Sequence, residues 1–196
     1  FVSSYLENPA STFGHLLLKF NSHNRYFGHS LLRPTLNFGA MVNPDDNPLI
    51  YALRGLFGGY DGRFTDERFY NFNHVYGENE LRDLWEYALN FTVEQKHRVT
   101  YHAWELLQNV NFTYYFFLDN CAYRIAELLE MAWTDTTRIN TSGAIWAIPV
   151  DVVFKLKNFK KKSGEQSLLG VPKLIPSRQR KLQNRTAQLS EMEQNN

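Results

Sequence analysis

Short apolar runs separated by polar turns mark the first quarter of the chain. Residues 15–20 read His-Leu-Leu-Leu-Lys-Phe and end in the polar turn of residues 21–24. An apolar run bounded by turn residues is typical of a strand, and we expect its partner within residues 29–42. After a second polar loop, residues 49–53 predict a third extended piece. This part of the chain therefore predicts a small sheet.

Helical spacing replaces these runs in the middle of the chain. The first predicted helix carries apolar residues at positions 81, 84, 85, 88 and 89. A second helix begins at a capping box, Thr92-Val93-Glu94-Gln95, and continues toward Leu107. The aromatic run of residues 113–118 then favours a buried strand. Strands and helices thus follow one another in separate groups, which indicates an α+β fold.

A third helix is predicted from Cys121 onward. Apolar residues lie four, seven, eight and eleven positions after this cysteine, so they share its helical face. Asn120 is the natural N-cap, because an Asn side chain can accept hydrogen bonds from the first free N–H groups. A last short helix is expected from Pro149, since proline suits the first turn.

Length and charge point to one domain with a distinct tail. The chain has 196 residues, of which 43% are hydrophobic, enough for one core. Residues 158–196 carry 8 Lys/Arg and 3 Asp/Glu, and residues 1–157 carry 13 and 17. We expect a domain over 1–157 and a basic, polar, loosely ordered tail over 158–196. The body lacks the basic density of a nucleic-acid surface, so no nucleic-acid partner is expected.

The cysteine and histidine content limits the chemistry. A single cysteine excludes an internal disulfide and a Cys-rich zinc site. We see no spacing of histidines and carboxylates that suits a metal, so neither a metal nor another cofactor is expected. No apolar run approaches the roughly 18 residues of a membrane-spanning helix.

Cys121 is the sharpest candidate for chemistry. A thiol in the first turn of a helix feels the positive end of the helix dipole, which favours the thiolate. The alternative is that Cys121 is a small buried hydrophobic residue. Histidines lie at positions 15, 23, 29, 74, 97 and 102. His15 stands out as a base because Gly14 precedes it and a predicted strand follows, which would hold the imidazole at a rigid edge.

Several segments together resemble one family. They are NPASTFGHLLLKF at 8–20, LNFGA at 36–40, GLFGGY at 55–60, RDLWEY at 82–87 and YFFLDNC at 115–121. In this order they resemble the periplasmic domain of Lnb-type lipoprotein N-acyltransferases, over about residues 4–157. The resemblance implies a periplasmic location in the bacterial envelope.

The resemblance also implies a fold and a site. The fold would be a circularly permuted papain-like fold, with an antiparallel sheet packed against a helical layer and the nucleophile at a helix N-terminus. Cys121 would be the nucleophile and His15 the general base. Asn37 or Ser11 would orient the imidazole, and Asn37 is favoured because a neighbouring strand could hold its amide beside the ring.

The implied activity is acyl transfer through a Cys121 thioester, from a phospholipid to an amine such as a lipoprotein N-terminus. A membrane surface would then be a partner as well. Two alternatives stay open, a cysteine peptidase or amidase acting on a peptide or cell-wall substrate, and an inactive binding module with Cys121 packed away from His15. The glycine-rich residues 55–62 would form either a mobile lip over an acyl groove or a plain hairpin turn.

Overall fold

The structure is a computed structural model that describes residues 14–21, 30–134, 139, 148–159 and 167–189. Within this part of the chain, strands and helices form an α+β fold with an antiparallel sheet. The sheet order is β1-β2-β3-β5, and every neighbouring pair is antiparallel. The strands are β1 (Leu18–Lys19), β2 (Pro34–Ala40), β3 (Tyr60–Arg68) and β5 (Phe112–Tyr114).

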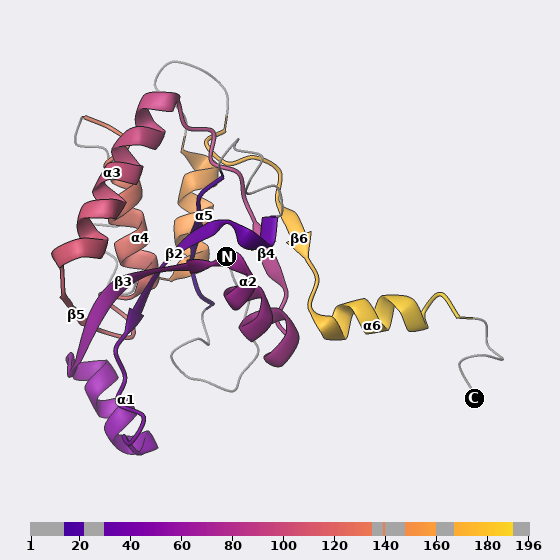
Figure 1. Cartoon of the computed structure of the whole chain (residues 1–196), viewed down its shortest axis with the longest axis horizontal. Coiled ribbons are helices and arrows are strands. Elements are labelled where there is room, and N and C mark those ends of the chain that lie inside the picture. The colour runs from indigo at the N-terminus through magenta and orange to yellow at the C-terminus, as the bar shows by residue number, and fades with distance from the viewer. Residues whose placement is uncertain (1–13, 22–29, 135–138, 140–147, 160–166, 190–196) are drawn as a thin grey trace.

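The helices lie partly in a layer beside the sheet and partly at its ends (Figure 1). The layer consists of α3 (Val93–Asn109), α4 (Cys121–Glu130) and α5 (Pro149–Asn158). The others are α1 (Pro48–Phe57), α2 (Phe69–Phe72), the π-helix η4 (Asn73–Asn79), the short 3₁₀ helix η3 (Ser30–Leu32) and α6 (Arg178–Thr186).

The main core lies between this helical layer and the sheet. Leu36 and Phe38 of β2 are 1% and 0% exposed, and Ile125 and Leu128 of α4 are each 1% exposed. β2 pairs with β3 from Pro34 to Ala40, the longest ladder in the sheet. The core therefore fixes α4 against β2, and with it the position of residue 121.

Three predicted helices are confirmed. The Thr92 side chain accepts a hydrogen bond from the N–H of Gln95 and the Gln95 side chain bonds back, which completes the predicted capping box of α3. α4 begins at Cys121 behind the Asn120 cap, and α5 begins at Pro149. The predicted partner of the first strand is also present, as β2.

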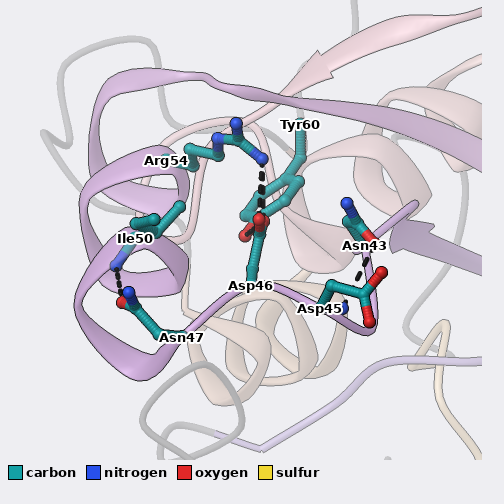
Figure 2. Close-up of polar contacts among 7 residues, drawn as sticks. All are labelled: Asn43, Asp45, Asp46, Asn47, Ile50, Arg54 and Tyr60. Carbon is teal, nitrogen blue, oxygen red and sulfur yellow. Dashed lines mark hydrogen bonds and ion pairs between the residues drawn. The ribbon is translucent and has the colours of Figure 1, made fainter.

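The third extended piece predicted at residues 49–53 is wrong, because these residues belong to α1. Pro48 occupies the first turn, and the Asn47 side chain accepts a hydrogen bond from the N–H of Ile50 (Figure 2). Gly58 ends the helix in the left-handed region, at a φ of 82°. The glycine-rich residues 55–62 thus end α1 and begin β3, so the plain hairpin turn is wrong.

The helix predicted from positions 81 to 89 is also wrong. This segment contains the strand β4 (Leu84–Glu86), which pairs with β6 (Lys173–Ile175). Leu81 has a φ of 56°, a conformation that an α-helix does not contain. A pairing partner almost ninety residues away overrides the local helical spacing of the apolar side chains.

The C-terminal segment differs from the loose tail expected over 158–196. Leu168 and Leu169 are 0% and 8% exposed, and both belong to the main core. The Asp83 carboxylate accepts hydrogen bonds from the Ser177 N–H and the Arg180 guanidinium, which holds the start of α6. α6 itself projects from the body and has no buried residue (Figure 1). Residues 167–177 are therefore part of the folded domain.

Gly55 provides a test of how α1 is held. A Cβ added at this buried position would lie 2.1 Å from the Phe116 ring. We expect Gly55→Ala to lower the free energy of unfolding by about 1–3 kcal/mol, although Ala normally stabilises a helix over Gly by about 1 kcal/mol. Urea unfolding measures the change, with Gly77→Ala as the control, because a Cβ there meets nothing closer than 3.5 Å. Equal stability of Gly55→Ala and the parent would contradict this packing.

Candidate functional site

The first turn of α4 is fixed by the side chain of Asn120. Its Oδ1 accepts hydrogen bonds from the N–H groups of Ala122 (3.0 Å) and Tyr123 (3.2 Å). Its Nδ2 donates to the carbonyl oxygen of Phe116 at 3.0 Å, across the preceding turn. Asn120 is itself buried. The cap thus holds Cys121 at the N-terminal end of α4, where the backbone favours negative charge.

The Cys121 thiol lies in a hydrogen-bonded, buried environment. The residue is 4% exposed. Burial alone raises the pKa of this thiol, but the charge of His15, a hydrogen bond to that imidazole and bonds from the N–H groups of Leu16 and Ala122 outweigh it. The net result is a pKa below the ordinary value, so the site favours the thiolate.

His15 lies between Cys121 and Asn37. The imidazole Nε2 is 2.6 Å from Asn37 Oδ1, and because an amide oxygen only accepts, Nε2 carries the hydrogen. Nδ1 is then left to interact with the Cys121 thiol. Burial lowers the pKa of His15. The charge of the Cys121 thiolate and the hydrogen bonds to Cys121 and Asn37 raise this pKa by more than burial lowers it, so the net shift is upward. Both shifts favour a thiolate–imidazolium pair.

Asn37 is held by the central pair of strands. It lies on β2 directly opposite Thr65 on β3. Asn37 Nδ2 donates to Thr65 Oγ1 at 3.4 Å, which directs the amide oxygen toward His15. The structure thus brings Cys121, His15 and Asn37 together in one hydrogen-bonded row. Ser11, the other candidate for the orienting group, lies outside the described residues.

Residues 1–158 match the model of the Lnb N-terminal periplasmic domain. The chain belongs to this family. Its location is periplasmic, as the family is defined, and the described residues contain no helix long and apolar enough to cross a membrane. No curated protein and no solved structure matches the chain. The three residues of the candidate site lie inside the matched range, whereas β6 and α6 lie beyond it.

Tyr76 is a member of the site in this Lnb domain that the sequence did not indicate. Its ring centroid lies 5.9 Å from that of His15, and its other neighbours include Phe72, with nearly parallel rings 6.4 Å apart. Burial, together with the charge of Cys121, raises the pKa of Tyr76 to about 12, so the phenol stays neutral. Tyr76 lies on the π-helix η4, a rare element often found at functional sites.

The other described histidines have partners elsewhere. His74 stacks on Tyr70, with ring centroids 6.0 Å apart, and His102 is 3.2 Å from the Glu105 carboxylate. His97 is exposed and packs beside Tyr101. Among the described residues, no group of three or more His, Cys, Asp or Glu side chains could hold a metal ion.

One pocket of about 290 Å³ lies beside the glycine-rich segment of the Lnb domain, away from the thiol. Its lining residues are Met41, Asn43, Arg54, Gly58, Gly59, Tyr60, Asp61 and Thr113. Nearby, the Asp46 carboxylate accepts hydrogen bonds from Arg54 (2.9 Å) and the Tyr60 hydroxyl (2.6 Å), which ties the preceding loop to α1 and β3 (Figure 2). This polar cluster has a structural role and does not contain the candidate site residues.

Asn37→Ala tests whether the amide supports the imidazolium. The substitution removes a hydrogen bond that raises the pKa of His15, so that pKa should fall and the thiolate should lose part of its counterion. A hydrogen bond to a charged group contributes about 1.5–3 kcal/mol, and we expect alkylation of Cys121 by iodoacetamide at neutral pH to slow about tenfold or more. Asn37→Asp keeps an acceptor at this position and should retain the reactivity. Unchanged kinetics in Asn37→Ala would remove Asn37 from the site.

Proposed function

We propose that this Lnb domain is a cysteine-dependent acyltransferase that moves a fatty acyl group from a phospholipid to an amine, such as the N-terminus of a lipoprotein. The observation that carries the proposal is the row of hydrogen bonds from Cys121 through His15 to Asn37. This row is the arrangement of nucleophile, base and orienting group used for covalent catalysis. The resemblance to lipoprotein N-acyltransferases supports the choice of substrates.

The first half-reaction forms the thioester. The Cys121 thiolate attacks the carbonyl carbon of the phospholipid ester, and the carbonyl oxygen becomes an oxyanion. The N-terminal end of α4 favours negative charge at this point. The ester C–O bond then breaks, and the leaving lysophospholipid oxygen takes the proton from the His15 imidazolium. The enzyme now holds the acyl group on sulfur, and His15 is neutral.

The second half-reaction passes the acyl group to the acceptor. The amine nitrogen attacks the thioester carbonyl carbon while His15 accepts the proton that the amine loses. The C–S bond breaks, the amide is released and the thiolate–imidazolium pair is restored. Asn37 holds the Nε2–H throughout, so the same ring nitrogen faces the reaction in both halves.

We also propose that the fold is a circularly permuted papain-like fold. The α+β architecture, with an antiparallel sheet beside a helical layer, supports this. The order of the site residues supports it further, because His15 precedes β1, Asn37 lies on β2, and Cys121 comes later, at a helix N-terminus.

The test uses the chain with a phospholipid that carries a labelled acyl group, and a lipopeptide with a free N-terminal amine. We expect the label to move onto the amine. Release of labelled fatty acid alone, at every concentration of the lipopeptide, would replace the proposal with a lipase-like activity. Cleavage of peptides without any action on lipid would instead favour the peptidase alternative.

A further inference from the structure

Helix α1 carries apolar side chains on two opposite faces. The inner face packs against the protein, where Gly55 is buried and the Tyr51 ring lies 5.0 Å from the Phe116 ring. The outer face is exposed, and its large apolar residues are Leu49 (70% exposed), Ile50 (38%), Leu53 (47%), Leu56 (45%) and Phe57 (78%). Positions 49, 53, 56 and 57 recur at helical spacing, so these side chains form one continuous stripe.

The exposed stripe carries no free charge, and two further exposed apolar residues precede the helix in the chain. Met41 and Val42, which lead from β2 into the loop before α1, are 54% and 40% exposed. Arg54 is the one charged residue in the sequence of α1, and its guanidinium is bonded to the Asp46 carboxylate, whose side chain is 8% exposed (Figure 2). Soluble domains rarely expose a large, uncharged apolar patch unless something covers it.

Helix α1, which carries the stripe on its outer face, is connected to the residue before the candidate nucleophile by two successive hydrogen bonds. The N–H of Phe116 donates to the carbonyl oxygen of Gly55 at 2.9 Å. The carbonyl oxygen of Phe116 accepts from Asn120, the residue that caps α4 before Cys121. Figure 1 shows α1 at one end of the sheet, projecting beyond β3 and β5. The helix that carries the stripe is therefore bonded through Phe116 to the cap that precedes the thiol.

We propose that α1 docks this domain onto a phospholipid bilayer, with Leu49, Leu53 and Phe57 entering the boundary between headgroups and acyl chains. A protein partner normally meets a polar rim that offers specific hydrogen bonds. Here the polar side chains beside the stripe, Asp46, Arg54 and Tyr60, are bonded to one another (Figure 2). A bilayer requires no such partners, because it accepts an apolar helix face by burial alone.

The inference rests on the proposed function in that a phospholipid substrate explains why a bilayer-docking helix is bonded to the segment that precedes the thiol. Docking by burial of apolar side chains can also be told apart from electrostatic binding by its dependence on lipid charge and salt. The exposed Asp45 on the adjoining loop gives anionic lipid no advantage, so binding should not need anionic lipid and should survive high salt. Binding through the basic helix α6 would instead require anionic lipid and weaken with salt.

The experiment measures co-sedimentation with vesicles of phosphatidylcholine, at low and high salt, in a Cys121→Ser background that prevents lipid turnover. The test variant is Leu49→Glu/Phe57→Gln, and the matched control is Trp104→Glu on α3, where the side chain is 63% exposed. All three altered side chains are exposed, so the fold should persist, and circular dichroism checks this. We expect the parent and the control to bind at both salt concentrations, and the double variant to bind at least about tenfold more weakly.

Equal binding by the double variant and the parent, or no binding by the parent, would overturn the proposal. The stripe would be assigned to a second copy of the chain if the parent does not bind vesicles but is a dimer in gel filtration, and the double variant is a monomer. Acyl transfer with the otherwise unaltered chain separates the two proposals. Vesicle binding without acyl transfer would reject the proposed function and retain the docking surface. Acyl transfer without α1-dependent binding would retain the proposed function and reject the docking surface.

Discussion

Replacing Cys121 with Ser, or His15 with Ala, is expected to remove almost all transfer of the acyl label from phospholipid to amine, by about a thousandfold or more. The serine hydroxyl has a much higher pKa than the thiol, so it cannot supply the anion that the site stabilises. Without His15, the thiol loses both its counterion and its hydrogen bond, and the leaving oxygen loses its proton donor.

A variant that carries both Cys121→Ser and His15→Ala should be no less active than either single variant, because the two residues act as one unit. His74→Ala is the control, since that ring lies on the surface against Tyr70. It should transfer label at the parental rate. Retention of more than about a tenth of the parental activity in both single variants would show that another group carries the reaction.

Alkylation of Cys121 by iodoacetamide is expected to persist to lower pH than alkylation of an ordinary cysteine. The pKa of the thiol is lowered, so the thiolate is already present at a pH where an ordinary thiol is protonated, and the rate follows the thiolate. In His15→Ala, burial remains and raises the pKa, while the main opposing charge is lost. The rate profile should therefore move to higher pH, and the rate at neutral pH should fall at least about tenfold.

Denatured protein gives the reference curve for an unperturbed thiol in the same chain. Cys121 is 4% exposed, so reagent access can slow alkylation at every pH, but it cannot move the inflection of the curve. The inflection is therefore the quantity to compare. Labelling that occurs only after denaturation would mean that Cys121 is a buried structural cysteine.

Local signals in the sequence were sufficient for α4 and its cap. Asn120 and the apolar spacing after Cys121 act within one helix, and the structure has both as expected. The proximity of His15 and Cys121 could not be derived from spacing alone, since 106 positions separate them; the family resemblance supplied it. Asn37 is favoured over Ser11 by the expectation that a neighbouring strand holds its amide, and it does lie on β2, beside the chain that leads from His15 into β1.

Long-range pairing and backbone geometry account for what the sequence did not predict. The spacing of Leu84 resembled a helix, but its strand is completed by residues 173–175 of the supposed tail. Thr65 contacts Asn37 only because of the register between β2 and β3. Tyr76 reaches His15 from a π-helix, whose extra residue per turn leaves no sequence signature. Each of these contacts depends on the assembled fold.

The most direct measurement is mass spectrometry of the chain after incubation with phospholipid in the absence of any amine acceptor. We expect a mass increase of one acyl chain, located on the peptide that contains Cys121. The adduct should be released by hydroxylamine, as a thioester is, and should be missing in Cys121→Ser. An unmodified Cys121 in protein that still transfers or releases acyl groups, or an adduct of equal yield in Cys121→Ser, would contradict the claim that this cysteine carries the acyl group.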